Sequence, residues 1–448
     1  MPQVQPFRAI SYAPARYAVP RIPERVRLPD EPAQEPGAGR TVSDLSDVAC
    51  PPYDVIDSAL QRSLLARDPH NAVRLELPPD ADPHAAAAAA LDAWLADGTL
   101  ERRPEASAYY YAHGSTANPD EPTVQGVLIR VLLEPFGRGV RAHEHTMPGP
   151  KADRLEHLRV TRTQFSPILA IYFDRSERYR HVMSRAWSDE WRARDGDGLL
   201  HTVAEIEADE RLLGYLSRQR LFIADGHHRY ETALAYQAEV RADAAYAHAV
   251  PGSLAADWIA MVLVNAELEE LDIRPTHRLL LDVPADALER LARGEVEPWA
   301  AEDVDAAGAE DALADAADGP GFVLLLPGDR AVRLTASRAA LAPRLQRERL
   351  STAVARLDLA ALHASILDDA LGIDAPAVAA GERLAYTRNA AEARRAVADG
   401  EAQAAILVRP TRLDDMAAVA SAGDVMPQKS TYFYPKLLTG MIFNPLED

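Results

Sequence analysis

The order of apolar and polar residues along this chain predicts a mixture of short strands and helices. Short apolar runs, which are typical of buried strands, occupy residues 108–112, 126–133, 168–173, 221–224 and 258–265. Apolar residues at helical spacing, several with proline or glycine near the ends, predict helices over 83–96, 154–162, 230–240, 357–371, 390–398 and 413–420. Residues 321–326 and 331–334 flank a Pro-Gly-Asp turn and predict a hairpin.

Two further segments follow simpler patterns. Residues 72–77 alternate between apolar and polar positions and predict a strand, and a polar stretch near 178–194 predicts a helix. Because strands and helices are mixed without strict alternation, the fold class is α/β, in the mixed α+β sense. A shift to alanine and aspartate near residue 283 supports three parts: an N-terminal α/β region (1–105), a central motif-bearing domain (106–282) and a C-terminal α/β domain (283–448) whose tail returns to the site.

Charge narrows the classes of partner. Among 448 residues, 48 Lys and Arg oppose 68 Asp and Glu, for a net charge of −20. Nucleic acids and anionic membranes reward clustered positive charge, so we expect neither as a partner. The single cysteine, Cys50, excludes an internal disulfide and a cysteine-based zinc cluster. With no leader visible at the start and no apolar run of membrane length, we expect a cytoplasmic protein.

Lysine is rare in this chain, since only three of the 48 basic residues are lysines: Lys151, Lys429 and Lys436. Arginine is a planar fork, whereas lysine is a compact ammonium on a flexible stem. In a chain that otherwise uses arginine, a lysine indicates a place where a point charge is needed. Two of the three lie close together near the end of the sequence.

The strongest candidate for chemistry is the segment from Ile223 to Tyr230, Ile-Ala-Asp-Gly-His-His-Arg-Tyr. An apolar strand delivers Asp225, a glycine permits a sharp turn, and two histidines and an arginine open a helix. Free N–H groups at a helix start favour an anion, and Arg229, His227 and His228 can bind phosphate oxygens. Asp225 can hold Mg²⁺ or accept a proton from a hydroxyl.

A second candidate, His-Glu-His-Thr over 143–146, precedes Lys151 and Arg154. The order His-Glu-His suggests zinc, but position 147 is methionine, so the helical metalloprotease pattern fails. Glu144 as a general base, with Lys151 and Arg154 binding an anion, needs fewer assumptions. His143 and His145 share one face of an extended segment and are candidate substrate or supporting residues.

The third candidate closes the chain: Met-Pro-Gln-Lys-Ser-Thr-Tyr-Phe-Tyr-Pro-Lys over 426–436. Lys429, Ser430, Thr431 and Lys436 can bind phosphate oxygens, although no glycine-rich loop precedes them and this is not a P-loop. Two weaker candidates are polar turns that could serve structure as well as function. They supply Tyr53, Asp54, Thr276, His277 and Arg278. No Gly-x-Gly-x-x-Gly follows a strand, which argues against a dinucleotide fold.

These motifs together resemble one bacterial family of domains of unknown function, number 1015 (DUF1015), over nearly the whole chain. They are Pro-Pro-Tyr-Asp-Val (51–55), His-Glu-His-Thr (143–146), Lys-x-x-Arg (151–154), the segment 223–230, Pro-Thr-His-Arg (275–278) and the segment 426–436. The family name carries no activity.

The Asp-Gly-His-His-Arg turn is also similar to one in the ParB/sulfiredoxin-like superfamily, in particular its free-serine kinases, over this short motif only. That resemblance implies a ParB/sulfiredoxin-like central region. It also implies a phosphate and Mg²⁺ cradle made of Asp225, His227, His228 and Arg229, with Asp225 as the metal ligand. A separate glutamate activates the substrate hydroxyl in those kinases, and Glu144 is the candidate here.

Our first hypothesis is therefore a phosphotransferase that moves a phosphoryl group to a small hydroxyl metabolite, with free L-serine as one candidate. Such transfer needs positioning and charge neutralisation more than covalent chemistry. Asp225 with Mg²⁺ would hold ATP, ADP or pyrophosphate, and Glu144 would take the hydroxyl proton. Positive charge would come from His227, His228, Arg229, Lys151, Arg154, Lys429 and Lys436.

Two other functions stay open. A metal-dependent hydrolase, such as a phosphatase, could use His143, His145, His227 and His228 as ligands. A non-catalytic nucleotide or anion sensor would bind its ligand tightly without turnover. In each case the expected partner is a small phosphate-bearing molecule. A DNA-binding module is the least favoured reading, because no basic stripe is visible.

Overall fold

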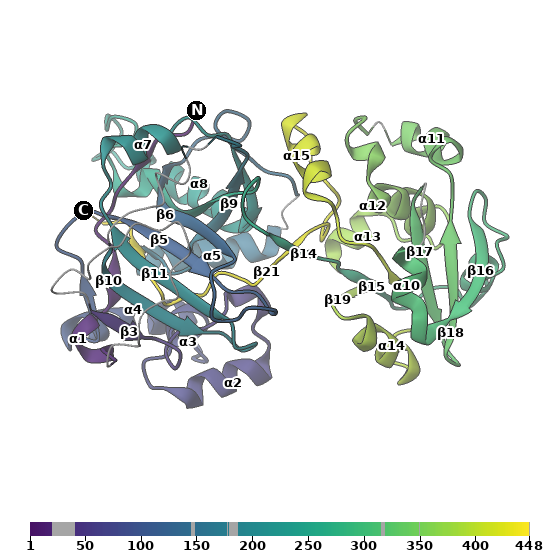
Figure 1. Cartoon of the computed structure of the whole chain (residues 1–448), viewed down its shortest axis with the longest axis horizontal. Helices are drawn as coiled ribbons and strands as arrows, with labels where there is room; N and C mark the ends of the chain where they lie inside the picture. Colours follow the sequence, from purple (N-terminus) through teal and green to yellow (C-terminus); the bar gives the residue numbers. More distant parts are fainter. Residues whose placement is uncertain are drawn as a thin grey trace. The chain divides into compact units, whose positions relative to one another are not determined.

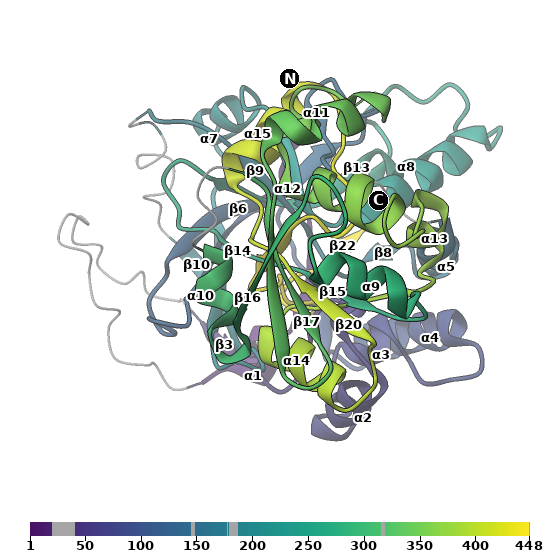
Figure 2. The ribbon, with the colours of Figure 1, turned by 90° about the vertical axis from the view of Figure 1, so that its right-hand side faces the viewer.

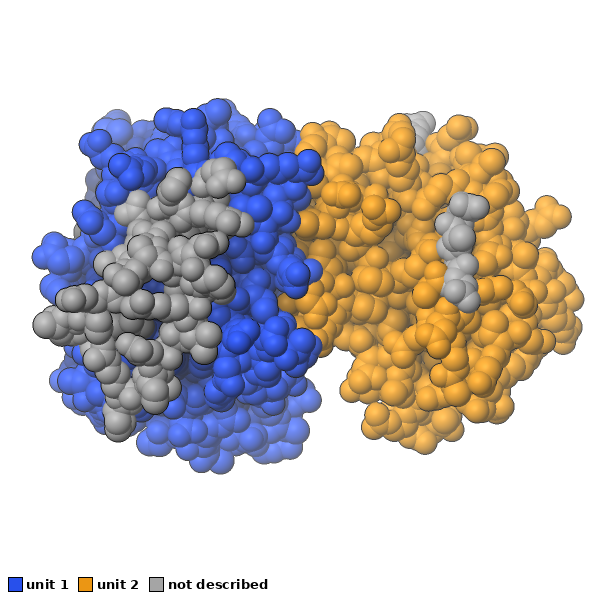
Figure 3. Space-filling view, viewed as in Figure 1, with its two compact units in different colours: residues 1–141, 148–271, 435–448 blue, residues 142–147, 272–434 orange. Residues whose placement is uncertain are grey.

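The computed structural model describes residues 1–19, 41–144, 148–176, 178, 187–314, 319–348 and 350–447, and its strands and helices are labelled in Figure 1. The chain forms two compact units, which Figure 3 colours separately. Unit 1 contains Met1–Arg141, Pro148–Leu271 and Pro435–Asp448, and unit 2 contains Ala142–Met147 and Asp272–Tyr434. Both units combine strands with helices, which confirms the mixed α/β fold class. The predicted three-part division stays a prediction about domains.

Unit 1 is built on a ten-stranded mixed sheet with the order β3-β10-β11-β5-β6-β13-β9-β12-β7, and β1 pairs with β6. Every residue of β13 and β9 is buried, as expected for strands covered on both faces. Its strands are β1 (Val4–Gln5), β3 (Val42–Asp44), β5 (Ala108–His113), β6 (Val124–Leu132), β7 (Val140–Arg141), β9 (Ile168–Tyr172), β10 (Trp187–Arg194), β11 (Leu200–Ile206), β12 (Leu221–Asp225) and β13 (Trp258–Asn265).

The helices of unit 1 include a neighbouring pair that carries two of the sequence motifs. Helix α5 (Pro148–Thr161) packs against α8 (His227–Ala242) and α4 (Pro83–Ala96). The others are α1 (Pro14–Tyr17), α2 (Ser58–Arg67), α3 (Val73–Glu76), α7 (Glu210–Leu216) and the 3-10 turns Tyr53–Val55 and Ala255–Asp257. Two short antiparallel pairs complete the unit: β2 (Ile10–Tyr12) with β4 (Leu100–Arg102), and β8 (Thr163–Gln164) with β22 (Asn444–Pro445).

The C-terminal segment Pro435–Asp448 is an integral part of unit 1. Thr439 pairs with Cys50, and Phe443 pairs with Ile10. The buried Arg130 donates to Asn444 Oδ1 at 2.6 Å and to the Pro445 carbonyl at 2.5 Å. These contacts bring Lys436 into the same unit as the Asp-Gly-His-His-Arg turn.

Unit 2 is built on a six-stranded antiparallel sheet with the order β16-β18-β17-β20-β15-β19. Figure 2 presents this sheet together with its helices. Apolar residues of α10 (Ala309–Ala314) and α14 (Ala390–Ala398) pack on one face, against β17, β18 and β20. The strands are β15 (His277–Leu280), β16 (Ala300–Asp305), β17 (Gly321–Leu326), β18 (Arg330–Thr335), β19 (Leu384–Thr387) and β20 (Ala404–Leu407).

The remaining elements of unit 2 are mostly short helices. They are α9 (Ala285–Ala292), α10 (Ala309–Ala314), α11 (Arg338–Arg347), α12 (Asp358–Ala361), α13 (Ala375–Ala380), α14 (Ala390–Ala398), α15 (Leu413–Ser421), the 3-10 turns Ala306–Gly308 and Val354–Arg356, and a π-helix over Leu362–Asp368. A two-stranded pair joins β14 (Asp272–Arg274) to β21 (Tyr432–Tyr434). Over the residues that the structure describes, no helix is both long and apolar enough to cross a membrane.

The strongly patterned elements confirm the predictions made from the sequence. The helices predicted over 83–96 and 390–398 and the strand over 258–265 have those same bounds. The hairpin is β17–β18. The helix predicted from residue 230 begins three residues earlier, at His227, because the left-handed Gly226 ends the strand and starts the helix.

Three predicted elements were wrong in type or form. Residues 73–76 form helix α3 and not a strand. A helix was predicted near 178–194, but residues 187–194 form strand β10, because pairing with β3 and β11 overrides their polar character. The earlier part of this predicted helix lies largely outside the described residues. The helix predicted over 357–371 is α12 followed by the π-helix.

Candidate functional site

The turn between β12 and α8 depends on Gly226. Its φ of +96° lies in the left-handed region that favours glycine. A Cβ at this position would lie 3.0 Å from Ile168 Cγ1 and 3.1 Å from Arg229 Nε. The glycine therefore lets β12 deliver Asp225 directly to the start of α8. There Arg229 lies one helical turn beyond the carboxylate.

Both carboxylate oxygens of Asp225 are bound by cations. Oδ2 accepts from Arg229 NH2 at 2.6 Å, and Oδ1 accepts from Lys436 Nζ. Burial by itself would raise the pKa of Asp225, but the positive charges of Lys436 and Arg229 hold that pKa well below its ordinary value. The structure thus joins the turn to the last lysine of the chain through an ionised carboxylate.

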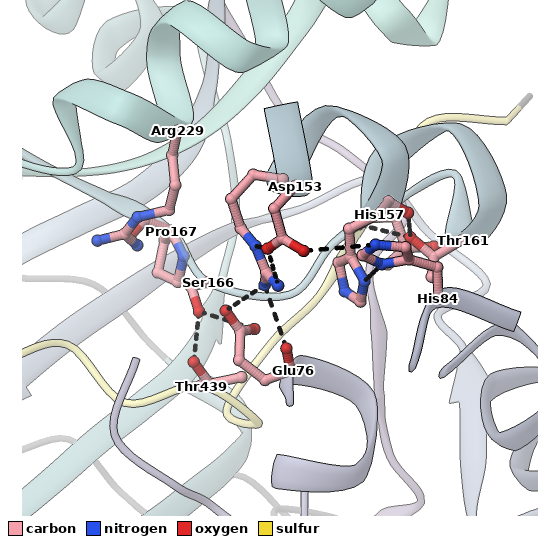
Figure 4. A network of polar contacts seen from close by, with 11 residues as sticks. Glu76, His84, Asp153, His157, Thr161, Ser166, Pro167, Arg229 and Thr439 are labelled. Carbon is pink, nitrogen blue, oxygen red and sulfur yellow. Dashed lines mark hydrogen bonds and ion pairs between the residues drawn. The ribbon is translucent and has the colours of Figure 1, made fainter. Parts of the chain in front are cut away.

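Arg154 and Arg229 line one cavity in unit 1, which we call the arginine cavity. Its volume is about 50 Å³, room for a few water molecules or one small anion. Its walls are Tyr53, Glu76, Arg154, His157, Leu158, Thr163, Gln164, Phe165, Ser166, Arg229, Thr232 and Ile259. Figure 4 shows Arg229 coming from α8 toward the same region as Glu76 and Ser166.

Each arginine of the cavity is held by several acceptors. Arg229 NH1 donates to the Pro167 carbonyl at 2.5 Å. Arg154 donates to the Glu76 carbonyl at 3.1 Å and, through Nε and NH2, to Asp153 at 2.8 and 2.7 Å. Its guanidinium carbon lies 4.7 Å from the centre of the Tyr53 ring. Both guanidiniums are therefore fixed in orientation.

Glu76 is the buried carboxyl beside these cations. Its side chain lies 3.7 Å from Arg154 NH1 and accepts from Ser166 Oγ at 3.3 Å, and Ser166 is in turn hydrogen-bonded to Thr439. Burial raises the pKa of Glu76, although Arg154 and Arg229 oppose the rise. Burial, with the charge of Asp54 next, raises the pKa of Tyr53 to about 12. Tyr53 is therefore a neutral phenol, and Asp54 itself is exposed.

The other predicted residues of unit 1 lie near this turn on α5 and α8. Lys151 Nζ donates to Glu231 Oε2 at 2.7 Å, so α5 and α8 are joined by an ion pair. His227 is 8% exposed, and His228 is partly buried in the same first turn of α8. Neither histidine nor Lys151 is among the residues that line the arginine cavity.

A second group of predicted residues comes together in unit 2. The buried His143 Nε2 lies 2.9 Å from Thr431 Oγ1. Glu144 Oε1 accepts from the Lys429 N–H at 2.7 Å. Lys429 has a φ of +56°, which is unusual for a residue with a Cβ. Ser430 is tied to its own loop, because its hydroxyl donates to the Pro427 carbonyl at 2.5 Å.

The Pro-Thr-His-Arg turn belongs to this second group. Arg278 is fully buried and donates to the carbonyls of Thr276, Gln428 and Lys429. His277 Nδ1 accepts from the Val408 N–H at 3.2 Å, and burial lowers the pKa of His277 to about 4. The His277 ring is therefore neutral, and it serves as an acceptor for a main-chain N–H group.

The predicted residues thus divide between the two units. Unit 1 contains Tyr53, Asp54, Lys151, Arg154, Asp225, His227, His228, Arg229 and Lys436, and unit 2 contains His143, Glu144, Thr276, His277, Arg278, Lys429, Ser430 and Thr431. The structure brings Arg154, Arg229 and Tyr53 to one cavity and Asp225 to Lys436. His145 lies outside the described residues.

The side chains around Asp225 do not fit a magnesium ion. A divalent cation there would have to displace, or lie beside, the two fixed positive charges that already bind the carboxylate. In the part of the chain that the structure describes, no group of three or more His, Cys, Asp and Glu side chains could hold a metal. We therefore assign no step to a metal at this turn.

Sequence reasoning missed several polar residues of the cavity. His157 lines it, and burial lowers the pKa of His157 to about 3, so this ring is neutral. His84 Nδ1 lies 3.4 Å from His157 Nδ1, and His84 Nε2 lies 3.4 Å from Asp153. Glu76 stands in a short alternating segment that also contains Arg74, and Ser166 follows Thr163-Gln164-Phe165. Nothing in these short segments distinguishes the two residues from ordinary polar positions, so the sequence carries no signal for them.

Comparisons with known proteins give one family match. The sequence matches the family described as "Protein of unknown function (DUF1015)" over residues 36–360. No curated protein matches this chain.

Several solved structures are similar at low levels. A free serine kinase in complex with AMP is 12% identical, covers 68% of this chain and 86% of its own, and has a TM-score of 0.35. SbnI with a C-terminal truncation from Staphylococcus aureus is 13% identical, covers 71% and 87%, and has a TM-score of 0.37. A conserved hypothetical protein from Pyrococcus furiosus is 13% identical, covers 69% and 92%, and has a TM-score of 0.35. Similarity this low leaves the activity to be argued from the residues of the chain itself.

Proposed function

This chain belongs to the DUF1015 family of proteins of unknown function, and from the chemistry of its arginine cavity we propose that it is a phosphotransferase. The proposed reaction moves a phosphoryl group from ATP, ADP or pyrophosphate to a small hydroxyl metabolite, with free L-serine as one candidate. The observation that carries the proposal is that Arg154 and Arg229, on different helices, line one small cavity in an acidic protein.

The cavity suits a single phosphate group in size and in charge. A cavity of about 50 Å³ is large enough for one such group. A guanidinium has five N–H groups, and the hydrogen bonds to Asp153, Glu76, Pro167 and Asp225 use three on Arg154 and two on Arg229, so both side chains can still donate to phosphate oxygens. The Tyr53 hydroxyl remains protonated at neutral pH and can donate a third hydrogen bond. Among the described residues that line the cavity, Glu76 is the one carboxyl, and burial raises its pKa.

Asp225 is proposed to position the cations. Its carboxylate binds Arg229 NH2 and Lys436 Nζ on its two oxygens, so the charges of α8 and of the C-terminal segment are held together. Phosphoryl transfer is promoted mainly by such fixed positive charge around the transferred group. In the reaction the acceptor oxygen forms a bond to phosphorus, the bond to the leaving phosphate breaks, and a base takes the hydroxyl proton.

The identity of that base stays a prediction. Glu144 is the candidate from the sequence, and its Oε1 accepts the Lys429 N–H. Glu144 belongs to unit 2, so the proposed phosphate site rests on unit 1 alone.

Binding measurements with arginine variants test the proposal. We expect calorimetry to show binding of ATP, ADP or pyrophosphate by the intact chain. Arg229→Met and Arg154→Met should each weaken that binding about tenfold or more, since each removes charge-assisted hydrogen bonds. Phosphorus NMR of the same mixtures with hydroxyl metabolites, L-serine among them, should show a new phosphate ester.

The matched control is Arg211→Met, which removes an exposed arginine from α7 in the same unit. It should leave affinity unchanged. Because Arg229→Met could disturb the fold, Arg229→Lys keeps a charge but loses the fork and should still weaken binding. Equal affinity in the intact chain and in both cavity variants would refute the phosphate site.

A non-catalytic anion sensor is the second candidate. One observation favours it: both oxygens of Asp225 are occupied by cations, so this carboxylate is not an available base. A sensor would bind the same phosphates through Arg154 and Arg229 and give no phosphate ester. Binding without transfer in single-turnover mixtures would therefore select this reading over the phosphotransferase.

A further inference from the structure

Arg278 of β15 is a buried guanidinium whose hydrogen bonds to described residues all go to main-chain carbonyls. Its side chain is fully buried. It donates to the Thr276 carbonyl and to the carbonyls of Gln428 and Lys429, at 3.4 and 3.3 Å. Among the described residues, no carboxylate forms an ion pair with it. The neutral carbonyls bind its NH1 and NH2 groups but, within the described residues, no negative charge lies at ion-pair distance from it.

An uncompensated buried charge is expensive, and proteins rarely keep one without a reason. Burial lowers the pKa of Arg278 to about 10, with Tyr386 and Glu144 opposing that shift only in part. Glu144 cannot serve as the direct partner, because it forms no ion pair with Arg278 and its Oε1 accepts the Lys429 N–H. Unit 2 therefore holds a cation whose missing partner would be an anion.

Buried polar atoms of Arg278 and of three residues that contact or influence it also have no hydrogen-bond partner among the described residues. Arg278 Nε is one of them, and the Tyr386 hydroxyl is another. Tyr386 lies directly opposite Arg278 in the β15–β19 pair, with 5.8 Å from the guanidinium carbon to the ring centre. The remaining two are Gln428 Oε1 and His363 Nε2. Native proteins satisfy most buried polar groups, so such a group of four needs an explanation.

The backbone near these atoms is distorted in two places. His363 lies in the π-helix Leu362–Asp368, and π-helical turns occur often at functional sites. Lys429, whose carbonyl accepts from Arg278, has a left-handed φ of +56°. His363 also lies close enough to Arg278 for that charge to add to burial in lowering the pKa of His363 to about 3. The ring is therefore neutral beside the guanidinium.

We propose that unit 2 binds a small organic carboxylate that also carries a hydroxyl or amino group. The carboxylate would accept from Arg278 Nε and the Tyr386 hydroxyl, and the hydroxyl or ammonium would donate to Gln428 Oε1. Such a ligand supplies both the missing negative charge and the missing donor. The residues proposed to bind this ligand all belong to unit 2, whereas those of the proposed phosphate site belong to unit 1.

Titration calorimetry of the intact chain tests this site with four probes. Acetate offers a carboxylate alone, glycolate and glycine add a hydroxyl or an ammonium, and ethylene glycol lacks the charge. We expect glycolate or glycine to bind more tightly than acetate, and ethylene glycol not to bind. No binding of any carboxylate probe at millimolar concentration, or equal binding of ethylene glycol, would overturn the proposal.

Variants assign the binding to named atoms. Arg278→Met should weaken glycolate or glycine binding about tenfold or more, and it should fold, since an apolar side chain of similar volume tolerates burial. Tyr386→Phe removes only the hydroxyl and should weaken binding by a smaller factor. The control Arg293→Met, at a side chain that is 61% exposed in the same unit, should have no effect.

Two outcomes separate this site from the phosphate site. Arg154→Met and Arg229→Met should leave glycolate and glycine binding unchanged while they weaken nucleotide binding. Carboxylate binding that persists in both Arg278→Met and Tyr386→Phe would overturn the proposal. The proposal would also fail if inorganic phosphate bound more tightly than every carboxylate probe and lost that binding in Arg278→Met.

Discussion

Single residues decide where the charges of unit 1 lie. Gly226 permits the turn that follows β12, Asp225 holds two cations, and Arg154 and Arg229 are fixed by carbonyls and carboxylates. The sequence indicated these four residues because they stand in short, unusual motifs. It did not indicate Glu76, since a single carboxyl in a short alternating segment acquires its role only from what the fold places beside it.

Gly226→Ala tests the demand for a left-handed residue at this turn. We expect a loss of about 1 to 2 kcal/mol in the free energy of unfolding, because a Cβ disfavours positive φ. The contact of 3.0 Å with Ile168 would add to the loss. Urea denaturation followed by circular dichroism measures the change.

Gly214→Ala is the matched control. Gly214 lies inside α7 with no atom within 4 Å of the added Cβ, so alanine should stabilise the chain by about 0.5 to 1 kcal/mol. The explanation fails if the two substitutions shift the unfolding curve in the same direction by the same amount.

At the scale of elements, long patterns predicted structure well and short ones did not. Helix α14 and strand β13 have the bounds that their periodicity predicts. Helix α3 is only four residues long, and no periodicity can be read reliably over one turn. Its conformation depends on Asn71, whose side chain accepts from the Val73 N–H and donates to the carbonyls of Asp47 and Ala49.

Asn71→Ala should therefore destabilise unit 1. The side chain is fully buried, and its removal leaves two main-chain carbonyls and one N–H with fewer partners, at a cost of about 1 to 3 kcal/mol. Because α3 carries Glu76, the same variant should also weaken anion binding in the arginine cavity. Chemical denaturation and calorimetry measure the two effects.

Asn118→Ala, at an exposed loop position, is the comparison for this prediction. It should change the free energy of unfolding by about 0.5 kcal/mol or less. If Asn71→Ala proves equally mild, the side-chain hydrogen bonds do not determine α3.

At the scale of the whole molecule, buried histidines link stability to pH. Burial lowers the pKa values of His113, His157 and His363 to about 3 and that of His277 to about 4. The unfolded chain takes up these protons near pH 6.5, whereas the folded chain does not. Stability that is present above pH 6.5 is therefore lost as the pH falls toward 4.

Each such histidine contributes a slope of about 1.4 kcal/mol per pH unit within that window. His157→Phe should reduce the dependence of the urea midpoint on pH between 7 and about 5. His248→Gln, at an exposed position, should leave the dependence unchanged. Equal pH dependence in the intact chain and in His157→Phe would contradict the assignment.

The sequence by itself determined the mixed α/β class, the family, the main helices and strands, and the motifs that carry charge. These follow from local patterns, because apolar periodicity and glycine conformation act over a few residues. Only the tertiary structure decided which motifs meet. Arg154 and Arg229 share a cavity, Lys436 reaches Asp225, and Arg278 is buried with no ion-paired carboxylate among the residues that the structure describes. Contacts between residues far apart in sequence depend on how strands pair and helices pack, which no local pattern records.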